Sequence, residues 1–458
     1  MKSQNSGNPV YLVVVCLVAT LGGLLFGYDT AVISGGIVFL RQYFQLSPAA
    51  EGWAASSALL GCVVGAGLAG TLNDHFGRKK VMLLSAVLFI VCAVGTALPR
   101  TLNEFVFFRF IGGIGVGAAS MTSPLYIAEV SPARIRGRMV SLNQLAIVSG
   151  MLVVYFVNYF IAGLGDETWK VNQSWRWMFA SQNIPGLLFL VLLFLVPESP
   201  RWLAQRGRED RALAVLARVN GEQQAPVELQ RIREALDKEG QSLLQVFQPG
   251  MRLVLIIGIM LAVLQQVTGI NVFLYYAPEI FKRIAGAQTD VALLQTVVIG
   301  AVNLLFTLVA IGTVDRWGRK PLMIAGFAGM GISLFALGFA AYLQRTDIWI
   351  LVFILGYIAS FALSVGPVTW VILSEIFPTR IRGRAMSIAT VCLWMANYAV
   401  SQTFPMMDQQ DWLVAHFHHA LPFWLYGGFC GVAIIFLAAF VPETKAKSLE
   451  EIESLWLR

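Results

Sequence analysis

The sequence predicts an all-α membrane protein with twelve transmembrane helices in two related six-helix bundles. Two observations predict this fold class. Of the 458 residues, 57% are hydrophobic and only 13% are charged, whereas soluble domains carry about 25% charged residues. In addition, three polar motifs of the first half return in the same order in the second half. This repetition indicates that one half-protein was duplicated.

The repeated motifs connect apolar segments, and each pair shares its glycines, charges or prolines. The paired segments are 73–79 and 314–320, 129–138 and 375–384, and 196–199 and 441–444. Duplicated membrane halves are typical of carriers in which two bundles rock about a site near the middle of the membrane. Transport is therefore the leading hypothesis.

Twelve apolar runs are each long enough to cross a hydrocarbon core of about 30 Å as a helix. They show too little alternation, and are too long, for the strands of a β-barrel. The first six predicted spans are 10–39, 51–72, 80–98, 103–128, 138–163 and 176–197. The second six are 251–281, 291–314, 320–344, 347–377, 384–407 and 420–441.

These spans divide the chain into four parts: an N-terminal bundle at 1–198, a linker at 199–250, a C-terminal bundle at 251–441 and a tail at 442–458. The linker alternates charges with apolar residues at helical spacing, and Gly221 and Pro226 interrupt the pattern. We expect several short amphipathic helices there, on the cytoplasmic face.

The distribution of the basic residues that give the net charge of +7 indicates how the protein is oriented in the membrane. Basic residues gather in alternate loops, at 78–80, 134–138, 316–320 and 380–384. By the positive-inside rule these loops and both termini are cytoplasmic in a multi-pass protein of the inner (plasma) membrane. No basic stripe of the kind that binds nucleic acid is present.

Several other patterns have a structural explanation. Gly65–Gly70 has the letters of a dinucleotide-binding loop, but it lies within a span, where close helix packing explains it better. His416, His418 and His419 fit a solvated outer loop better than a metal site. We expect no metal, no cofactor and no enzymatic activity, because no catalytic constellation is found. The cysteines all lie in apolar spans, so we expect packing roles and no disulfides: Cys16, Cys62, Cys92, Cys392 and Cys430.

Asp29 lies well inside the first predicted span, where an ionisable side chain is costly and needs a partner or a water-filled cavity. Arg109 in the fourth span is its natural partner, because it lies at a similar depth from the same surface. One interpretation is a permanent structural ion pair. We favour the other, in which the pair breaks when the carboxylate takes up a proton, because such a pair can couple transport to protons.

Amide side chains recur within the spans, and each must face protein, water or a ligand. Four residues around a helix-interrupting Gly269 are spaced to share one helix face: Gln265, Thr268, Asn271 and Tyr275. Amides can both donate to and accept from sugar hydroxyls, and Trp370 and Trp394 offer flat apolar surfaces for a sugar ring. The pattern favours a neutral sugar as substrate, and the alternative is that the amides only hold helices together.

These residues resemble the sugar-porter branch of the major facilitator superfamily over essentially the whole chain. The motifs that carry the resemblance are Gly77–Lys79, Gly318–Lys320, Pro197–Leu203, Gln265–Asn271, Gly366–Trp370 and Val441–Thr444. Within the branch, 27–35 and 404–408 are most similar to bacterial proton-coupled D-xylose symporters.

The resemblance implies a sugar site and proton coupling through Asp29 with Arg109. The implied sugar-binding residues are Gln144, Gln265, Gln266, Asn271, Tyr275, Asn303, Trp370 and Trp394. Met151 and Leu393 stand where the xylose symporters carry glutamines, which could relax the choice of sugar. The implied function is proton-driven import of a monosaccharide, with D-xylose preferred and glucose also bound. A facilitative carrier is the first alternative, and a non-transporting sugar sensor is a weaker one.

The resemblance also suggests a role for opposite charges at the cytoplasmic helix ends. Exposed ion pairs contribute only about 0–1 kcal/mol each. Many weak bridges therefore suit a gate that clasps the two bundles when the inside is shut and releases them when it opens. The candidate gate residues are Asp74, Arg78, Glu129, Arg134, Glu198, Arg201, Asp315, Arg319, Glu375, Arg380 and Glu443. We expect a monomer, because each chain contains both halves of its own path.

Overall fold

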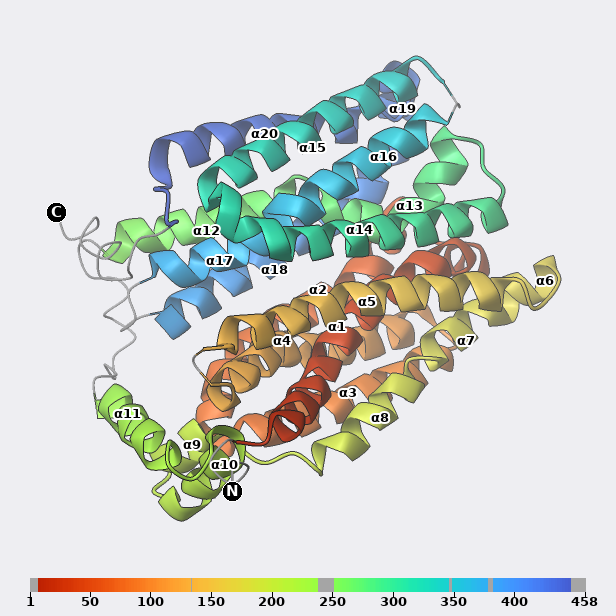
Figure 1. The fold of residues 1–458 in the computed structure, drawn as a ribbon. Coiled ribbons are helices and arrows are strands. Elements are labelled where there is room, and N and C mark those ends of the chain that lie inside the picture. The colour runs from red at the N-terminus through yellow and green to blue at the C-terminus, as the bar shows by residue number, and fades with distance from the viewer. Residues whose placement is uncertain (1–6, 133, 238–250, 346–347, 378–381, 446–458) are drawn as a thin grey trace.

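The computed structural model describes residues 7–132, 134–237, 251–345, 348–377 and 382–445. These residues form two bundles of long helices that lie side by side, with a group of short helices at one end (Figure 1). We call the end that carries the short helices the linker face and the opposite end the distal face.

The first bundle contains five long helices and a sixth span made of shorter pieces. The long helices are α1 (Pro9–Phe44), α2 (Pro48–Phe76), α3 (Arg78–Ala97), α4 (Leu102–Val130) and α5 (Arg136–Ala162). The sixth span comprises α6 (Glu167–Trp169), the π-helical turn η1 (Lys170–Ser174), α7 (Trp175–Ala180) and α8 (Asn183–Leu193). Asn8, Ser47 and Thr101 start α1, α2 and α4, because each side chain accepts a hydrogen bond from a backbone N–H of the first turn.

Three short helices follow the first bundle: α9 (Pro200–Gln205), α10 (Glu209–Asn220) and α11 (Ala225–Asp237). They pack around a small apolar core that includes Trp202, Leu216 and Leu229. The predicted short amphipathic helices are therefore confirmed over the described part of the linker, and residues 238–250 lie outside it.

The second bundle repeats the plan of the first. Its helices are α12 (Met251–Val267), α13 (Ile270–Ile284), α14 (Thr289–Trp317), α15 (Arg319–Tyr342), α16 (Trp349–Ser360), η3 (Phe361–Val365), α17 (Gly366–Ile376), α18 (Arg382–Asp408), α19 (Asp411–Phe417) and α20 (Leu421–Phe440). Gly269, with φ of 90°, separates α12 from α13. The predicted interruption at Gly269 is confirmed. The prediction of one continuous helix face through Gln265, Thr268, Asn271 and Tyr275 is wrong, because α12 ends at Val267 and a separate helix begins at Ile270.

Eleven spans among the described residues are long and apolar enough to cross a membrane. The remaining predicted span corresponds to α18, whose amides Asn397 and Gln402 and several hydroxyl side chains lower its hydropathy. The sixth span differs most from the prediction of 176–197, because its helices run from Glu167 to Leu193. The fold is the predicted twelve-helix arrangement of two related bundles.

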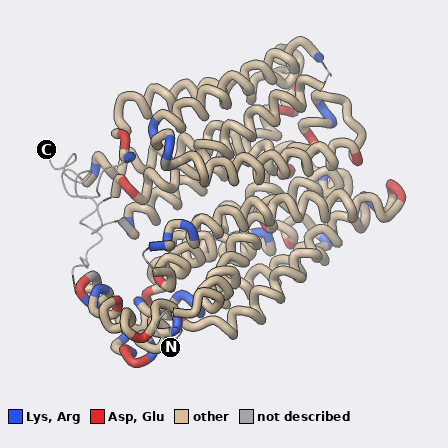
Figure 2. The backbone as a smooth tube through the Cα atoms, viewed as in Figure 1, with Lys and Arg blue, Asp and Glu red and all other residues tan. Residues whose placement is uncertain are grey.

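Among the described residues, the most extensive contacts between the two bundles are those of α1 with α13, α2 with α18 and α5 with α14. Charged residues are concentrated mostly at the two ends of the bundles, as Figure 2 shows. The buried middle of the protein is therefore largely apolar, and the few polar groups within it stand out as candidate functional residues.

Candidate functional site

Asp29 on α1 and Arg109 on α4 form a fully buried ion pair. Arg109 Nη1 lies 3.2 Å from Asp29 Oδ2 and also donates to the Asp29 backbone carbonyl at 3.1 Å. Their side chains are 0% and 1% exposed. The predicted pairing is confirmed, and all of it lies within the first bundle.

The amides at the junction of α12 and α13 form a hydrogen-bonded chain. Asn271 Nδ2 donates to Gln266 Oε1 at 2.6 Å, and Gln266 Nε2 donates to Gln265 Oε1 at 3.3 Å. Gln265 Nε2 in turn donates to the backbone carbonyls of Val365 and Gly366, both at 3.2 Å. The helix break thus brings three of the predicted sugar-binding residues together, although they do not share one helix.

Two further candidates extend this polar region towards α18. Asn397 Nδ2 lies 3.5 Å from the Tyr275 hydroxyl, and Asn397 Oδ1 accepts from Ser401. Trp394 is buried with its ring centroid 5.5 Å from that of Phe26 on α1. Its Nε1 is buried and has no acceptor among the described residues, so the indole can donate to a ligand as well as stack on one.

The remaining candidates lie on neighbouring helices. Asn303 on α14 is buried, Gln144 on α5 and Trp370 on α17 are half-buried, and α5 packs against α14. Met151 on α5 and Leu393 on α18 are both buried in the apolar core that joins the two bundles. The two residues that stand where the xylose symporters carry glutamines therefore lie on helices that line the contact between the bundles.

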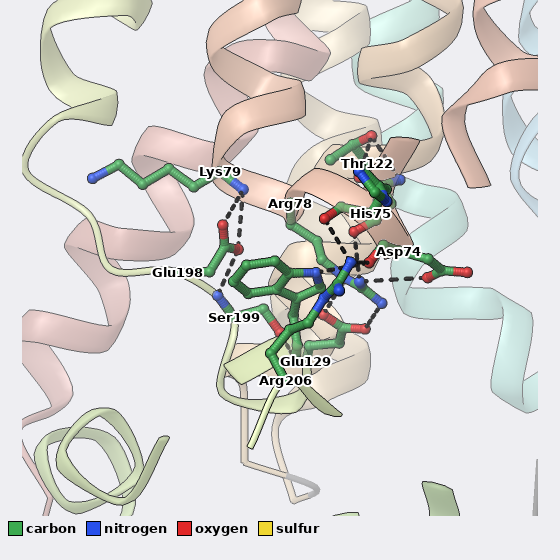
Figure 3. A network of polar contacts seen from close by, with 11 residues as sticks. Asp74, His75, Arg78, Lys79, Thr122, Glu129, Glu198, Ser199 and Arg206 are labelled. Carbon is green, nitrogen blue, oxygen red and sulfur yellow. Dashed lines mark hydrogen bonds and ion pairs between the residues drawn. The ribbon is translucent and has the colours of Figure 1, made fainter. Parts of the chain in front are cut away.

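The linker face of the first bundle carries a network of charged side chains (Figure 3). Arg78 donates to both carboxylate oxygens of Glu129, at 2.9 and 2.8 Å, and lies 3.6 Å from Asp74. Ser199 also donates to Glu129, at 2.5 Å. Glu129 is therefore held by Arg78 in a bidentate pair, whereas Arg134 is exposed.

The second bundle repeats this arrangement at its own linker face. Arg319 lies 3.1 Å from Glu375, as Arg78 pairs with Glu129. Glu443 accepts from the backbone N–H of Lys320 at 3.0 Å. Arg201 is the second residue of α9, whereas Arg380 and the side chain of Asp315 lie outside the described residues. Both ion pairs join helices of one bundle.

Glu198 and Glu443 each cap a helix that follows a glycine with positive φ. Gly77 and Gly318 have φ of 95° and 89°, and a Cβ on Gly77 would lie 2.4 Å from Glu198 Oε2. Glu198 accepts from the backbone N–H of Lys79, at the positive end of α3. Burial raises the pKa of Glu198. Burial acts on Glu443 in the same direction, but hydrogen bonds from backbone N–H groups lower its pKa overall.

The distal face carries a network of ion pairs that joins the two bundles, in which the carboxylates are buried and the arginines are partly exposed. The sequence analysis did not identify this network. Arg41 of α1 pairs with Glu279 of α13 at 2.8 Å. Arg283 of α13 lies 3.1 Å from Glu279 and 3.7 Å from Glu51 of α2. Glu279 falls within the predicted span 251–281, and this carboxylate in an apolar run was the available signal.

Asp408 links this network to the histidine loop. Arg283 Nη1 lies 2.5 Å from Asp408 Oδ2, and His419 Nδ1 lies 3.0 Å from Asp408 Oδ1. The hydrogen bond to Asp408 raises the pKa of His419 above its usual value. His419 therefore belongs to the ionic network of the distal face, whereas His416 contacts the carbonyl of Trp412 in its own helix.

Comparison with known proteins gives a consistent result. The family described as "Sugar (and other) transporter" matches residues 15–456. The D-xylose-proton symporter of Escherichia coli (strain K12) is 51% identical, covering 98% of this chain and 96% of that protein. The arabinose-proton symporter of Bacillus subtilis (strain 168) is 43% identical, covering 98% and 96%.

Solved structures agree with the sequence comparison. The major facilitator superfamily proton:xylose symporter XylE bound to 6-bromo-6-deoxy-D-glucose has a TM-score of 0.85 and 50% identity, covering 98% of this chain and 100% of that chain. The inward open conformation of XylE from E. coli has a TM-score of 0.86 and 46% identity, covering 97% and 100%. The resemblance found in the motifs is confirmed. The chain belongs to the sugar (and other) transporter family, the sugar-porter branch of the major facilitator superfamily.

Proposed function

We propose that this protein imports a neutral monosaccharide, with D-xylose preferred, by symport with protons through alternating access. The observation that carries the proposal is the Asp29–Arg109 pair, because a fully buried carboxylate with a single guanidinium partner can be neutralised by one proton. Protonation would release Arg109 and so change the packing of α1 against α4. The relatives named as proton symporters of xylose and arabinose support this coupling.

The chemistry of the polar region supports a sugar as the substrate. The linked amides of Gln265, Gln266 and Asn271 offer both donors and acceptors, which is what sugar hydroxyls need. Trp370 and Trp394 add apolar surfaces on which a sugar ring can stack. In this proposal Gln144, Tyr275 and Asn303 complete the site.

Uptake into proteoliposomes tests the proposal. Purified protein is reconstituted, and accumulation of radiolabelled xylose, arabinose and glucose is measured with and without an inward proton gradient. We expect accumulation above the outside concentration only with the gradient, together with alkalinisation of the outside medium when sugar is added. Equilibration without accumulation would instead identify a facilitative carrier, and binding without uptake would identify a sensor.

The facilitative alternative rests on a specific observation, because a relative named glucose facilitated diffusion protein, from Zymomonas mobilis, is 39% identical. Asp29 argues against it, since an uncoupled carrier has no need of a buried carboxylate that changes its protonation. Sugar-dependent proton uptake separates the two functions directly.

The contacts between the bundles support alternating access. The Arg41–Glu279 and Glu51–Arg283 pairs join the bundles at the distal face, whereas the Arg78–Glu129 and Arg319–Glu375 pairs each stay within one bundle at the linker face. In our proposal the candidate gate charges of the linker face exchange partners between the bundles when that side closes. Disulfide cross-linking across each face in different sugar and pH conditions tests this exchange.

The proposal also covers topology and assembly. We infer that the linker face and both termini are cytoplasmic, because the basic loops lie at that end. The inferred division is a bundle at 1–198, a linker at 199–250, a bundle at 251–441 and a tail at 442–458. Terminal reporter fusions test the orientation. Light scattering of the purified protein tests whether it is a monomer in detergent, as we infer.

A further inference from the structure

We propose that Cys92 is a positioning residue whose thiol holds one oxygen of Asp29 and so sets the pH range over which the coupling carboxylate takes up its proton. This inference rests on the proposed function, because it assumes that Asp29 carries the proton. Cys92 lies on α3, and no motif of the sequence marks it as functional.

The two carboxylate oxygens of Asp29 have different partners. Oδ2 faces Arg109 Nη1 at 3.2 Å, and Oδ1 accepts from Cys92 Sγ at 3.7 Å. These are the side-chain hydrogen bonds to the carboxylate within the described residues. An ionised carboxylate has about four acceptor positions. The thiol is therefore the sole side-chain donor at Oδ1 and the weaker of the two partners.

The packing of three helices keeps the thiol at this position. Gly112 of α4 faces both groups, and a Cβ added there would lie 2.4 Å from Cys92 Sγ and 3.5 Å from Asp29 Oδ1. The absence of a side chain at Gly112 leaves the space that the thiol occupies between α3 and α4. Cys92 is fully buried, so the contact with Asp29 is shielded from water.

A weak donor suits a carboxylate that must gain and lose a proton in each cycle. A hydrogen bond to the ionised form favours that form, and a thiol donates more weakly than a hydroxyl. Removal of the donor leaves the ionised carboxylate less stabilised. Asp29 should then be protonated at a lower proton concentration, and the pH profile of coupled transport should move to higher pH. We expect a shift of about half a pH unit, because the thiol hydrogen bond is weaker than a usual hydrogen bond.

Cys62 provides a matched control. It lies on α2, is as completely buried as Cys92 and interacts electrostatically with Asp29 and Arg109, but the described hydrogen bonds to the Asp29 carboxylate come from Arg109 and Cys92. Cys62→Ala and Cys92→Ala remove the same atom from two neighbouring sites in the same bundle. A general loss of packing would affect both variants alike, whereas loss of the donor would affect only Cys92→Ala.

The experiment measures sugar-driven proton uptake in proteoliposomes from pH 5 to pH 9 for the wild type and both variants. We expect the midpoint of the Cys92→Ala profile to lie about half a pH unit above that of the wild type, and the Cys62→Ala profile to match the wild type. Sugar counterflow, which needs no net proton movement, should be retained. Cys92→Val, which fills the space without a donor, should show the same upward shift.

Two results separate the possible failures. If the Cys92→Ala and Cys92→Val midpoints coincide with those of the wild type and Cys62→Ala while uptake remains proton-coupled, the inference about the thiol is wrong and the proposed function stands. If the wild type shows no proton uptake with sugar, the proposed function is wrong, and the role given to Cys92 is wrong with it.

Discussion

Replacement of Asp29 by asparagine is the sharpest perturbation of the proposed mechanism. The amide has nearly the shape of the protonated carboxyl, so Asp29→Asn holds the carrier in its neutral state. At 3.2 Å the attraction to Arg109 amounts to about 5 kcal/mol for an effective dielectric constant of about 20. The variant loses this attraction permanently, whereas the wild type loses it only while the proton is bound. Coupling should therefore disappear.

The expected size of the effect follows from the gradient. One pH unit corresponds to about 1.4 kcal/mol, so one proton per sugar supports about tenfold accumulation across a one-unit gradient. Proteoliposomes with wild-type protein should approach that ratio, and those with Asp29→Asn should stop at equal concentrations while counterflow continues.

Asp408→Asn is the matched control for this prediction. Asp408 is also a buried carboxylate paired with an arginine, but it lies at the distal face. The control variant should still concentrate sugar, even if its rate changes. Accumulation by Asp29→Asn above the outside concentration would refute the coupling role and leave Asp29 as a structural residue.

Three further predictions concern the site and the distal face. Gln265→Ala and Trp370→Ala should each weaken sugar binding measured by calorimetry. The loss for Gln265→Ala should be about 1–3 kcal/mol, because sugar hydroxyls lose a hydrogen-bond partner. Unchanged affinity in both variants would contradict the proposed site. Met151→Gln combined with Leu393→Gln should widen the affinity ratio between xylose and glucose, because polar contacts discriminate more strongly than apolar ones, and an unmoved ratio would place selectivity elsewhere. Because the pKa of His419 is raised, its pairing with Asp408 should stabilise the fold fully below pH about 6.5 and be lost as the pH rises through the raised value. The free energy of unfolding of His419→Gln, measured by thermal unfolding, should therefore be lower than that of the wild type by about 1 kcal/mol at low pH only. An equal difference in this free energy at all pH values would contradict the prediction.

The sequence predicted the features that depend on local pattern and on depth in the membrane. Apolar run length located the spans, and an ionisable residue in each of two spans identified Asp29 and Arg109 as partners. The same reasoning failed at the junction of α12 and α13, where a face was extrapolated through Gly269 as if the helix continued. Helical spacing carries no information once the backbone leaves the helix, so the Asn271–Gln266–Gln265 chain required the three-dimensional structure.

The distal network could not be predicted for a different physical reason. Arg41 and Glu51 lie at the ends of helices, where single charges are common and reveal nothing about their partners. Their partners Glu279 and Arg283 come from the other half of the chain, and a pairing across the bundles depends on how the two halves dock. The linker-face charges were found because duplication repeated them, whereas the distal charges are not part of a repeated motif.

The Asp29–Arg109 pair lies wholly in the first bundle, and the chain from Asn271 to Gln265 lies wholly in the second. On the proposed function, the two bundles that arose by duplication have specialised. The first bundle provides proton coupling, and the second bundle provides most of the sugar selectivity. A substitution in the first half can turn a concentrating carrier into an equilibrating one without altering these amide contacts. Evolution can therefore change the two traits one at a time, and chimaeras of related carriers should inherit each trait from a different parent.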